Sequence, residues 1–154
     1  MNLKTIVMAT DFSEASLIAL ETALSLASEN SASLYLLHVM EFPASEDPDG
    51  SGLGAVVEKL DRDSMERLRD LIPEKGKRTL NIQTLVRHGA PAEQISALAR
   101  ETNADLIVVG THGRKGLARV FLGSTAEVLL RQAPCQTLVV KPRGRLTVPA
   151  EVMV

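Results

Sequence analysis

The chain of 154 residues has no tryptophan, one tyrosine and one cysteine. Aromatic residues make up only 3% of it, so it lacks the stacking platform on which many proteins bind single-stranded nucleic acid. The lone Cys135 has no partner for an intrachain disulfide. No charged stretch followed by an apolar segment opens the chain, and no apolar run approaches the roughly 20 residues that a membrane helix needs. We therefore expect a cytoplasmic protein without membrane insertion.

The charge balance is also unremarkable, with a net charge of -2 and an isoelectric point near 5.9. Such a balance gives no broad attraction to nucleic acid or to an anionic membrane, so any anion site must be local. Apolar residues make up 45% of the chain, mostly leucine, valine, isoleucine and alanine, which commonly fill the space between a sheet and its helices. The length predicts a single domain.

Short β-branched runs alternate with longer amphipathic stretches, a pattern typical of βα units wound about a parallel sheet. We expect five strands, at Leu3–Ala9, Ser33–Val39, Leu80–Val86, Asp105–Gly110 and Thr137–Val140. We expect four helices, the first capped by Asp11 or Ser13 and ending at Asn30 and Ser31, the second from Val57 to Leu71, the third from Pro91 and the last at Ser124–Arg131. The third strand reads as an edge strand.

Two segments carry no regular pattern. Residues 41–54 hold prolines, glycines and acidic residues without periodicity, which predicts a long loop. Residues 1–142 are expected to form the folded domain. The tail at 143–154 is too apolar for a purely solvated end, and we expect an edge strand or a contact with a partner subunit there.

The segment from Gly110 to Ser124 is the one that suggests chemistry. It follows a buried strand and holds four of the ten glycines and three basic residues, with no acidic residue. Glycines at a strand end let backbone N–H groups approach an anion. Ser124 and Glu127 have the spacing of a capping box, and a helix N-terminus favours an anion by about 0.3–1 kcal/mol. The segment matches neither a Walker A loop nor a dinucleotide fingerprint. The alternative is that these residues only make turns and cap a helix.

Asp11 gives an independent indication, because it lies just beyond the first predicted strand. If the first and fourth strands are neighbours, Asp11 and Gly110 flank the point where open α/β sheets bind ligands. The alternative is that Asp11 is a plain helix cap.

At these residues the sequence resembles the universal stress protein family, and in particular its ATP-binding branch. That branch carries the motif G-x2-G-x9-G-S/T, which Gly110, Gly113, Gly123 and Ser124 match. The stretches IVMATDFSEAS, DLIVVGTHGR and QTLVVK also look like strands of that family. The similarity covers roughly residues 1–142.

The resemblance implies an α/β fold, an open doubly wound sheet of five parallel strands in the order 3-2-1-4-5. It implies an adenine and ribose pocket lined by Ala9, Thr10, Asp11 and the backbone around Val39. Val109 and Gly110 would flank the ribose and first phosphate. The phosphates would be held by Gly113, Gly123, Ser124 and Thr125. It also implies a homodimer joined near the last strand, and Mg²⁺ or Mn²⁺ carried by the nucleotide.

The chain departs from the pattern in Arg114, Lys115 and Gly116, which leaves nucleotide preference and dimer geometry open. His112, within the motif, either contacts a phosphate or faces solvent. His38 is predicted to be a hydrogen-bonded core histidine and His88 to be exposed.

Cys135 is predicted to be a packed residue rather than a reactive thiol, and no cluster has metal-site spacing.

Together with these observations, the resemblance implies a nucleotide-binding stress-response or signalling module that recognises ATP, or ADP or AMP in its place. Two other functions stay open. One is a slow ATP hydrolase or phosphate-transferring enzyme, for which no residue that would position water can be named. The other is a scaffold dimer that binds no nucleotide.

Overall fold

The computed structural model describes residues 1–41, 52–111 and 122–142, and its strands form one sheet. The strands are β1 (Thr5–Ala9), β2 (Ser33–Met40), β3 (Ile82–His88), β4 (Leu106–Gly110) and β5 (Gln136–Val140). They are ordered β3-β2-β1-β4-β5, and each neighbouring pair is parallel. The predicted sheet order is confirmed, and the third strand does lie at an edge.

The helices are α1 (Glu14–Asn30), α2 (Leu53–Leu71), α3 (Glu74–Thr79), α4 (Pro91–Glu101) and α5 (Ser124–Gln132). The described residues thus hold five helices, and the prediction of four was wrong. Pro73 ends α2 as expected, but it then acts as the N-cap of α3, where Lys77 N donates to Pro73 O at 3.0 Å. The expected loop also ends earlier than predicted, because α2 begins at Leu53; residues 42–51 lie outside the described part.

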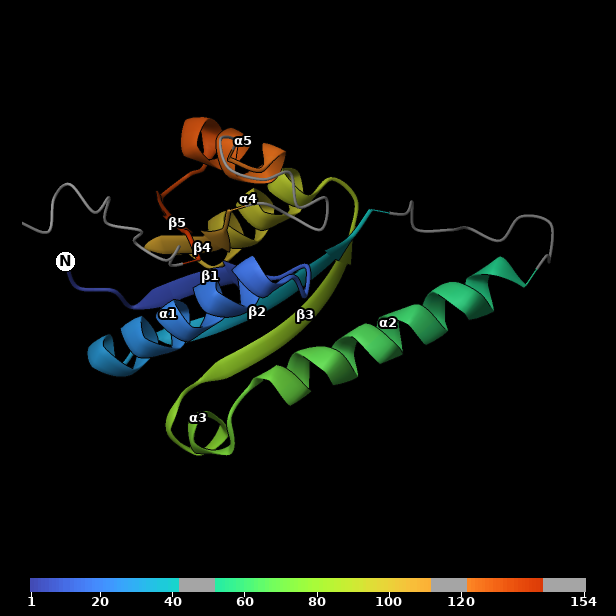
Figure 1. Ribbon diagram of the computed structural model, residues 1–154, viewed down its shortest axis with the longest axis horizontal. Helices are drawn as coiled ribbons and strands as arrows, with labels where there is room; N and C mark the ends of the chain where they lie inside the picture. Colours follow the sequence, from blue (N-terminus) through green and yellow to red (C-terminus); the bar gives the residue numbers. More distant parts are fainter. Residues whose placement is uncertain (42–51, 112–121, 143–154) are drawn as a thin grey trace, which may run out of the picture.

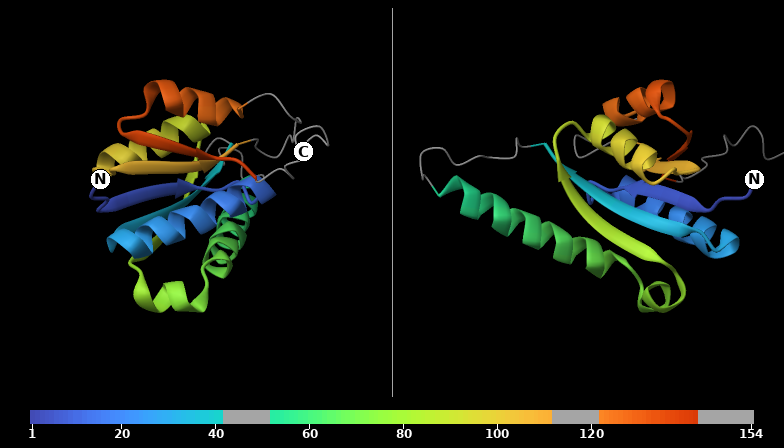
Figure 2. Two further views of the ribbon diagram at one scale, coloured as in Figure 1. Left: turned by 60° about the vertical axis from the view of Figure 1, so that its left-hand side comes forward. Right: turned by 180° about the vertical axis from the view of Figure 1, so that it is seen from behind.

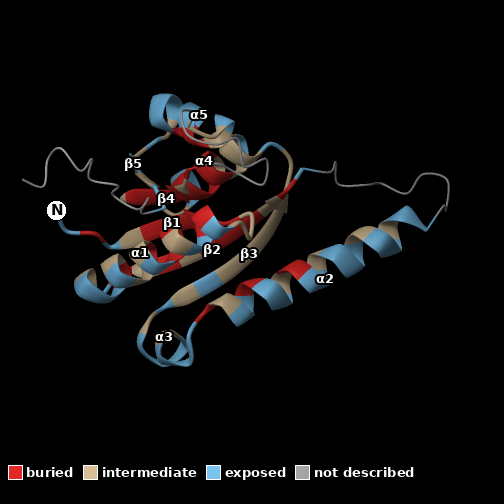
Figure 3. Ribbon diagram, viewed as in Figure 1, coloured by how far each residue is buried: buried red, intermediate tan, exposed pale blue. Residues whose placement is uncertain are grey.

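The sheet lies between two layers of helices, as Figures 1 and 2 show. The face that α1 and α2 cover contributes buried residues such as Ile6, Leu36 and Val108. The opposite face, covered by α4 and α5, contributes Val7 and Ile107. Neighbouring residues of each strand point to opposite faces, so these central strands are apolar on both sides. Figure 3 shows the buried residues gathered between the layers.

Helix α2 is buried against the sheet in its second half, whereas its start is exposed. Ser64 and Leu68 are its buried residues, whereas Leu53 and Val56 near its start are 52% and 54% exposed. Figures 1 and 2 show the start of α2 projecting past the ends of the strands. No helix in the described part of the chain is long and apolar enough to cross a membrane.

Strand β1 has β2 on one side and β4 on the other, so the strand order reverses between β1 and β4. At the amino ends, Asp105 Oδ2 accepts hydrogen bonds from Lys4 N at 2.8 Å and Thr5 N at 2.9 Å. These bonds hold the pKa of the Asp105 carboxyl below its usual range. They also connect β1 and β4 at their amino ends. The carboxyl ends of the same two strands form the switch point, where ligands bind in such sheets.

Candidate functional site

The turn that follows β1 is built by short side-chain to backbone hydrogen bonds. Asp11 Oδ1 accepts from Ser13 N at 3.0 Å, and Ser13 Oγ accepts from Ser16 N at 3.3 Å. Ser13 is therefore the N-cap of α1, while Asp11 closes the turn before it. Phe12, between them, has a φ of 64°, in the left-handed region that few non-glycine residues adopt.

Thr10 holds this turn to the sheet. It is only 4% exposed, and its N–H donates to Leu37 O at 2.9 Å. Its hydroxyl accepts from Phe12 N at 3.0 Å and lies 2.8 Å from Ser16 Oγ. Because Ser16 Oγ already donates to Ser13 O, Thr10 Oγ1 must donate within the pair. The hydroxyl of Thr10 is thus engaged inside the protein, and its role is to shape the turn.

His38 completes the support of the turn from β2. Its Nδ1 lies 2.8 Å from Thr10 O, and the residue is 5% exposed. A carbonyl oxygen only accepts, so Nδ1 carries the proton. The prediction of a hydrogen-bonded core histidine is confirmed.

His88 differs from its prediction. Its side chain is only 18% exposed, and Nε2 lies 2.8 Å from Asp61 Oδ1 of α2. The expectation of an exposed residue was wrong, because α2 packs beside the edge strand on which His88 lies. Cys135 is partly buried, and burial raises the pKa of its thiol, with the Asp105 charge adding to the rise. The prediction that Cys135 is a packed residue is confirmed.

The end of β4 shows a close approach to α1. A Cβ atom on Gly110 would lie 2.7 Å from both C and O of Ala15, so only glycine fits there. The sequence pattern suggested an anion-binding reason for this glycine and missed the packing one. Thr111 is 1% exposed and donates its N–H to Val140 O at 3.0 Å. Its hydroxyl has no hydrogen-bond partner among the residues that the structure describes.

Helix α5 begins differently from the prediction. Gly123 is its N-cap and gives no side-chain hydrogen bond, while Ser124 is its first residue and is exposed. The proposed capping box of Ser124 and Glu127 was therefore wrong. Glu127 N donates to Gly123 O at 3.1 Å, and Glu127 lies 3.8 Å from Arg131 in a loose ion pair. Because glycine has no side chain, the N-cap residue supplies no acceptor for the first N–H groups of α5, which also have no acceptor within the helix.

The remaining predicted site residues divide into two groups. Ala9, Val39 and the buried Val109 belong to the face that α4 and α5 cover, which places them together. Thr125 is partly buried in the first turn of α5. The second group, His112, Gly113 and Arg114, lies outside the described residues.

Connectivity brings the start of α5 to the same edge of the sheet as the turn after β1. Because α5 links two parallel strands, β4 and β5, it runs opposite to them and begins at their carboxyl ends. Leu122, just before the helix, packs with the cluster that holds Val109 and Ala126. Within residues 1–41, 52–111 and 122–142, no group of three or more His, Cys, Asp or Glu residues has the arrangement of a metal site. The edge therefore offers N–H and hydroxyl donors for an anion but no such acidic cluster of its own.

Comparison with known proteins agrees with this architecture. The chain is 36% identical over 142 residues to a universal stress protein of Methanocaldococcus jannaschii, covering 90% of this chain and 82% of that protein. It is 32% identical over 146 residues to a universal stress protein A homologue of Coxiella burnetii, covering 91% and 97%. Among solved structures, the M. jannaschii protein MJ0577 aligns with a TM-score of 0.81 at 25% identity, covering 94% of this chain and 99% of that one.

A crystal structure of a universal stress protein in complex with cAMP aligns with a TM-score of 0.62 at 25% identity, covering 92% of this chain and 98% of the other. The family model described as the universal stress protein family matches residues 2–141. The chain belongs to the universal stress protein family.

Proposed function

We propose that this protein binds ATP, or ADP or AMP in its place, at the carboxyl ends of β1 and β4, and that binding is its function in stress response or signalling. The observation that carries the proposal is the start of α5. Its N-cap is Gly123, which has no side chain to accept from the first N–H groups of the helix. Because α5 follows β4 in the chain, it begins at the edge of the sheet where the strand order reverses. Backbone N–H groups and the helix dipole at such a position favour a phosphate.

The described residues fit an adenine nucleotide in two further respects. Thr111 Oγ1, at the end of β4, is a buried hydroxyl without a partner among the described residues, and buried hydroxyls normally find one. Ala9 and Val39 give small and branched apolar surfaces at the ends of β1 and β2, which suit one side of an adenine ring. Asp11 follows β1 in the chain and its Oδ1 accepts from Ser13 N, and in this proposal its carboxylate is the acceptor for ribose hydroxyls.

In this proposal Thr10 lies beside the adenine and ribose, and Val109 and Gly110 flank the ribose and first phosphate. Thr10 and Val109 are buried, and Gly110 packs on α1. The proposal extends to His112, Gly113 and Arg114 as phosphate contacts, with Ser124 and Thr125 supplying N–H and hydroxyl groups. It draws support from the related structure solved with cAMP, a nucleotide that shares the adenine, ribose and phosphate groups. Mg²⁺ or Mn²⁺ would arrive with the phosphates and neutralise part of their charge.

The decisive experiment begins with freshly purified protein that is denatured, so that chromatography can identify any released nucleotide. Titration calorimetry with ATP, ADP and AMP, with and without Mg²⁺, then ranks the ligands. The informative variant is Gly123→Val, whose side chain would cover the α5 N–H groups while its φ of -55° suits any residue. We expect binding to weaken at least tenfold.

The matched control is Ala90→Val, because Ala90 is also an N-cap without a side-chain hydrogen bond, at the start of α4. Its binding should equal that of the wild type. Absence of released nucleotide together with absence of heat for all three ligands would refute the proposal and favour the scaffold function. Multiple turnover of ATP by the wild type would instead favour the slow hydrolase.

We also propose a cytoplasmic homodimer whose contact includes β5 and residues 143–154. β5 is the outer strand beside β4, and Leu138 on it is 36% exposed. An exposed outer strand is a ready template for pairing with a second copy. Sedimentation of the full chain beside a Leu138→Lys variant tests this, with a shift from dimer to monomer expected.

A further inference from the structure

The turn that carries Asp11 contains a non-glycine residue in an unfavourable backbone conformation. Phe12 has a φ of 64°, which an aromatic residue adopts only where its surroundings hold it there. Two hydrogen bonds define the turn at this point, from Phe12 N to Thr10 Oγ1 and from Ser13 N to Asp11 Oδ1. The position of the Asp11 carboxylate therefore depends on whatever fixes the Phe12 side chain.

The Phe12 side chain contacts residues from two other elements. On β2, the ring of His38 is 4.6 Å from the Phe12 ring, centroid to centroid, with the planes inclined at 44°. On α2, Arg67 Cζ lies 3.8 Å from the Phe12 ring centroid, a cation–π contact. His38 also holds the carbonyl of Thr10. The three side chains thus form a stack, Arg67–Phe12–His38, that joins α2 to the turn and to the sheet.

Arg67 adjoins the buried Leu68, in the half of α2 that is anchored to the sheet. A shift of α2 would change the Arg67–Phe12 contact, and a change in the conformation of the turn would alter the same contact with α2. The first half of the helix projects past the sheet, as described above. The stack therefore links the candidate ligand edge to a helix that presents apolar residues to solvent.

From this geometry we infer that Arg67, Phe12 and His38 are positioning residues for the candidate site, and that the stack couples occupancy of the site to α2. The coupling part rests on the nucleotide-binding function proposed above. Energetic coupling is reciprocal. If Arg67 stabilises the turn that receives the nucleotide, bound nucleotide must stabilise the anchored half of α2 through the same contact.

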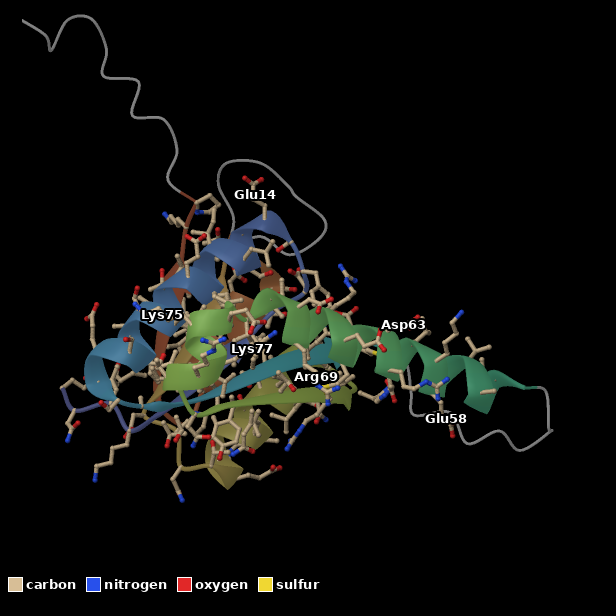
Figure 4. The ribbon with its side chains drawn as sticks, turned by 90° about the horizontal axis from the view of Figure 1, so that it is seen from below. Glu14, Glu58, Asp63, Arg69, Lys75 and Lys77 are labelled. Carbon is tan, nitrogen blue, oxygen red and sulfur yellow. The ribbon has the colours of Figure 1, made fainter. Side chains whose placement is uncertain are left out.

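The test compares Arg67→Gln with Arg69→Gln. Both arginines are exposed residues of α2, and Arg69 is labelled in Figure 4. Both changes remove one positive charge from the same helix, but only the first removes the contact with Phe12. We expect ATP to bind about two to five times more weakly to Arg67→Gln, the size of an exposed cation–π contact, and unchanged to Arg69→Gln. Arg67→Lys, which keeps a cation over the ring, should recover part of the loss.

Hydrogen exchange gives a readout that does not depend on nucleotide. Without ATP, the amides of Phe12 and Ser13 should exchange faster in Arg67→Gln than in the wild type or in Arg69→Gln. With ATP, the amides of residues 61–71 should gain protection in the wild type and in Arg69→Gln, and should gain less in Arg67→Gln.

Two results would overturn the inference. One is equal exchange at Phe12 and Ser13 in both glutamine variants. The other is ATP binding by the wild type with equal affinities for Arg67→Gln and Arg69→Gln. If the wild type binds no ATP while the turn amides still exchange faster in Arg67→Gln, the positioning role stands and both the coupling and the proposed function fail.

Discussion

The two strand ends that meet at the switch point are built in contrasting ways. After β1, the hydroxyls of Thr10, Ser13 and Ser16 and the Asp11 carboxylate all have hydrogen-bond partners within the turn. After β4, Thr111 Oγ1 has no partner among the described residues, and α5 starts without a side-chain cap from Gly123. The polar side chains after β1 are therefore hydrogen-bonded to one another and to the nearby backbone. The end of β4 and the start of α5 instead have donors with no hydrogen-bond partner among the described residues.

This difference indicates that the two strand ends have different roles in the candidate site. A turn whose polar groups satisfy one another is rigid and can serve as a fixed wall. A buried hydroxyl such as that of Thr111 is costly unless a ligand, water or another segment forms a hydrogen bond with it. We infer that the β1 end forms a fixed side of the candidate site and that the β4 end supplies unused donors for the proposed phosphates. The variants below test that contrast, beginning with the largest expected effect on stability.

The close approach between β4 and α1 is the feature most sensitive to substitution. In Gly110→Ala the new Cβ would lie 2.7 Å from backbone atoms of Ala15, which can move only if α1 moves. We expect a loss of about 3 kcal/mol in the free energy of unfolding, the upper part of the usual range for overpacking. Urea unfolding followed by circular dichroism measures it.

Gly76→Ala is the control, because a Cβ there meets Ile72 Cγ2 at an ordinary 3.5 Å inside helix α3. Alanine in a helix should leave the unfolding free energy unchanged or raise it by about 0.5–1 kcal/mol. Similar losses in the two variants would mean that the approach of α1 to β4 does not limit this position.

The hydrogen-bonded turn after β1 depends on His38 of β2 for its stability. His38→Ala removes the donor to Thr10 O and the ring beside Phe12, leaving a buried carbonyl without a partner. We expect a loss of about 2 kcal/mol, measured by urea unfolding. His38→Asn should recover part of it, because the asparagine amide places an N–H donor near the position of Nδ1. Equal losses in both would show that the hydrogen bond contributes nothing beyond packing.

The amino ends of β1 and β4 provide a pH-dependent test. The Asp105 carboxyl has a lowered pKa because its charged form accepts from Lys4 N and Thr5 N. A carboxyl with a lower pKa in the folded state stabilises that state above its unfolded pKa of about 3.9. That stability is lost as the pH falls through the folded pKa.

Asp105→Asn should therefore unfold at lower urea concentration than the wild type at pH 7, and the gap should narrow towards pH 3. The effect should be smaller than that of His38→Ala, because the carboxylate is accessible to water. Asp63→Asn, at an exposed position of α2 labelled in Figure 4, makes the same charge change away from the strand ends. A gap that stays constant with pH, or appears equally in Asp63→Asn, would contradict the assignment.

Periodicity and buried runs were enough to predict the sheet, because parallel central strands are apolar on both faces and leave an unambiguous pattern. The sequence also predicted the core role of His38, since a histidine inside an apolar strand must find a hydrogen-bond partner. It failed at α3, where a proline that ended one helix also began another, and at Ser124, where the spacing of a capping box occurred without its geometry.

The tertiary contacts could not be predicted, because they join residues far apart in the chain. Nothing in the pattern around Gly110 indicates that Ala15 packs against it, and nothing places Arg67 over Phe12. The burial of His88 depends on where α2 lies against the edge strand. Such contacts follow from the packing of helices on the sheet, which sequence periodicity does not specify.

The smallest effect on stability is expected at the end of β4, where a change should instead weaken nucleotide binding. Thr111→Val replaces a buried hydroxyl that lacks a partner among the described residues with a methyl group of similar size. We expect the unfolding free energy to change by no more than about 0.5 kcal/mol, while ATP binding weakens about tenfold if the hydroxyl donates to a phosphate. Thr137→Val is the matched control. Thr137 Oγ1 on β5 is also buried without a partner among the described residues, but Thr137 is the second residue of β5, beside Ile107 and away from the carboxyl ends. A clear loss of stability in Thr111→Val without nucleotide would mean that the hydroxyl is already satisfied within the protein, and the contrast between the two strand ends would disappear.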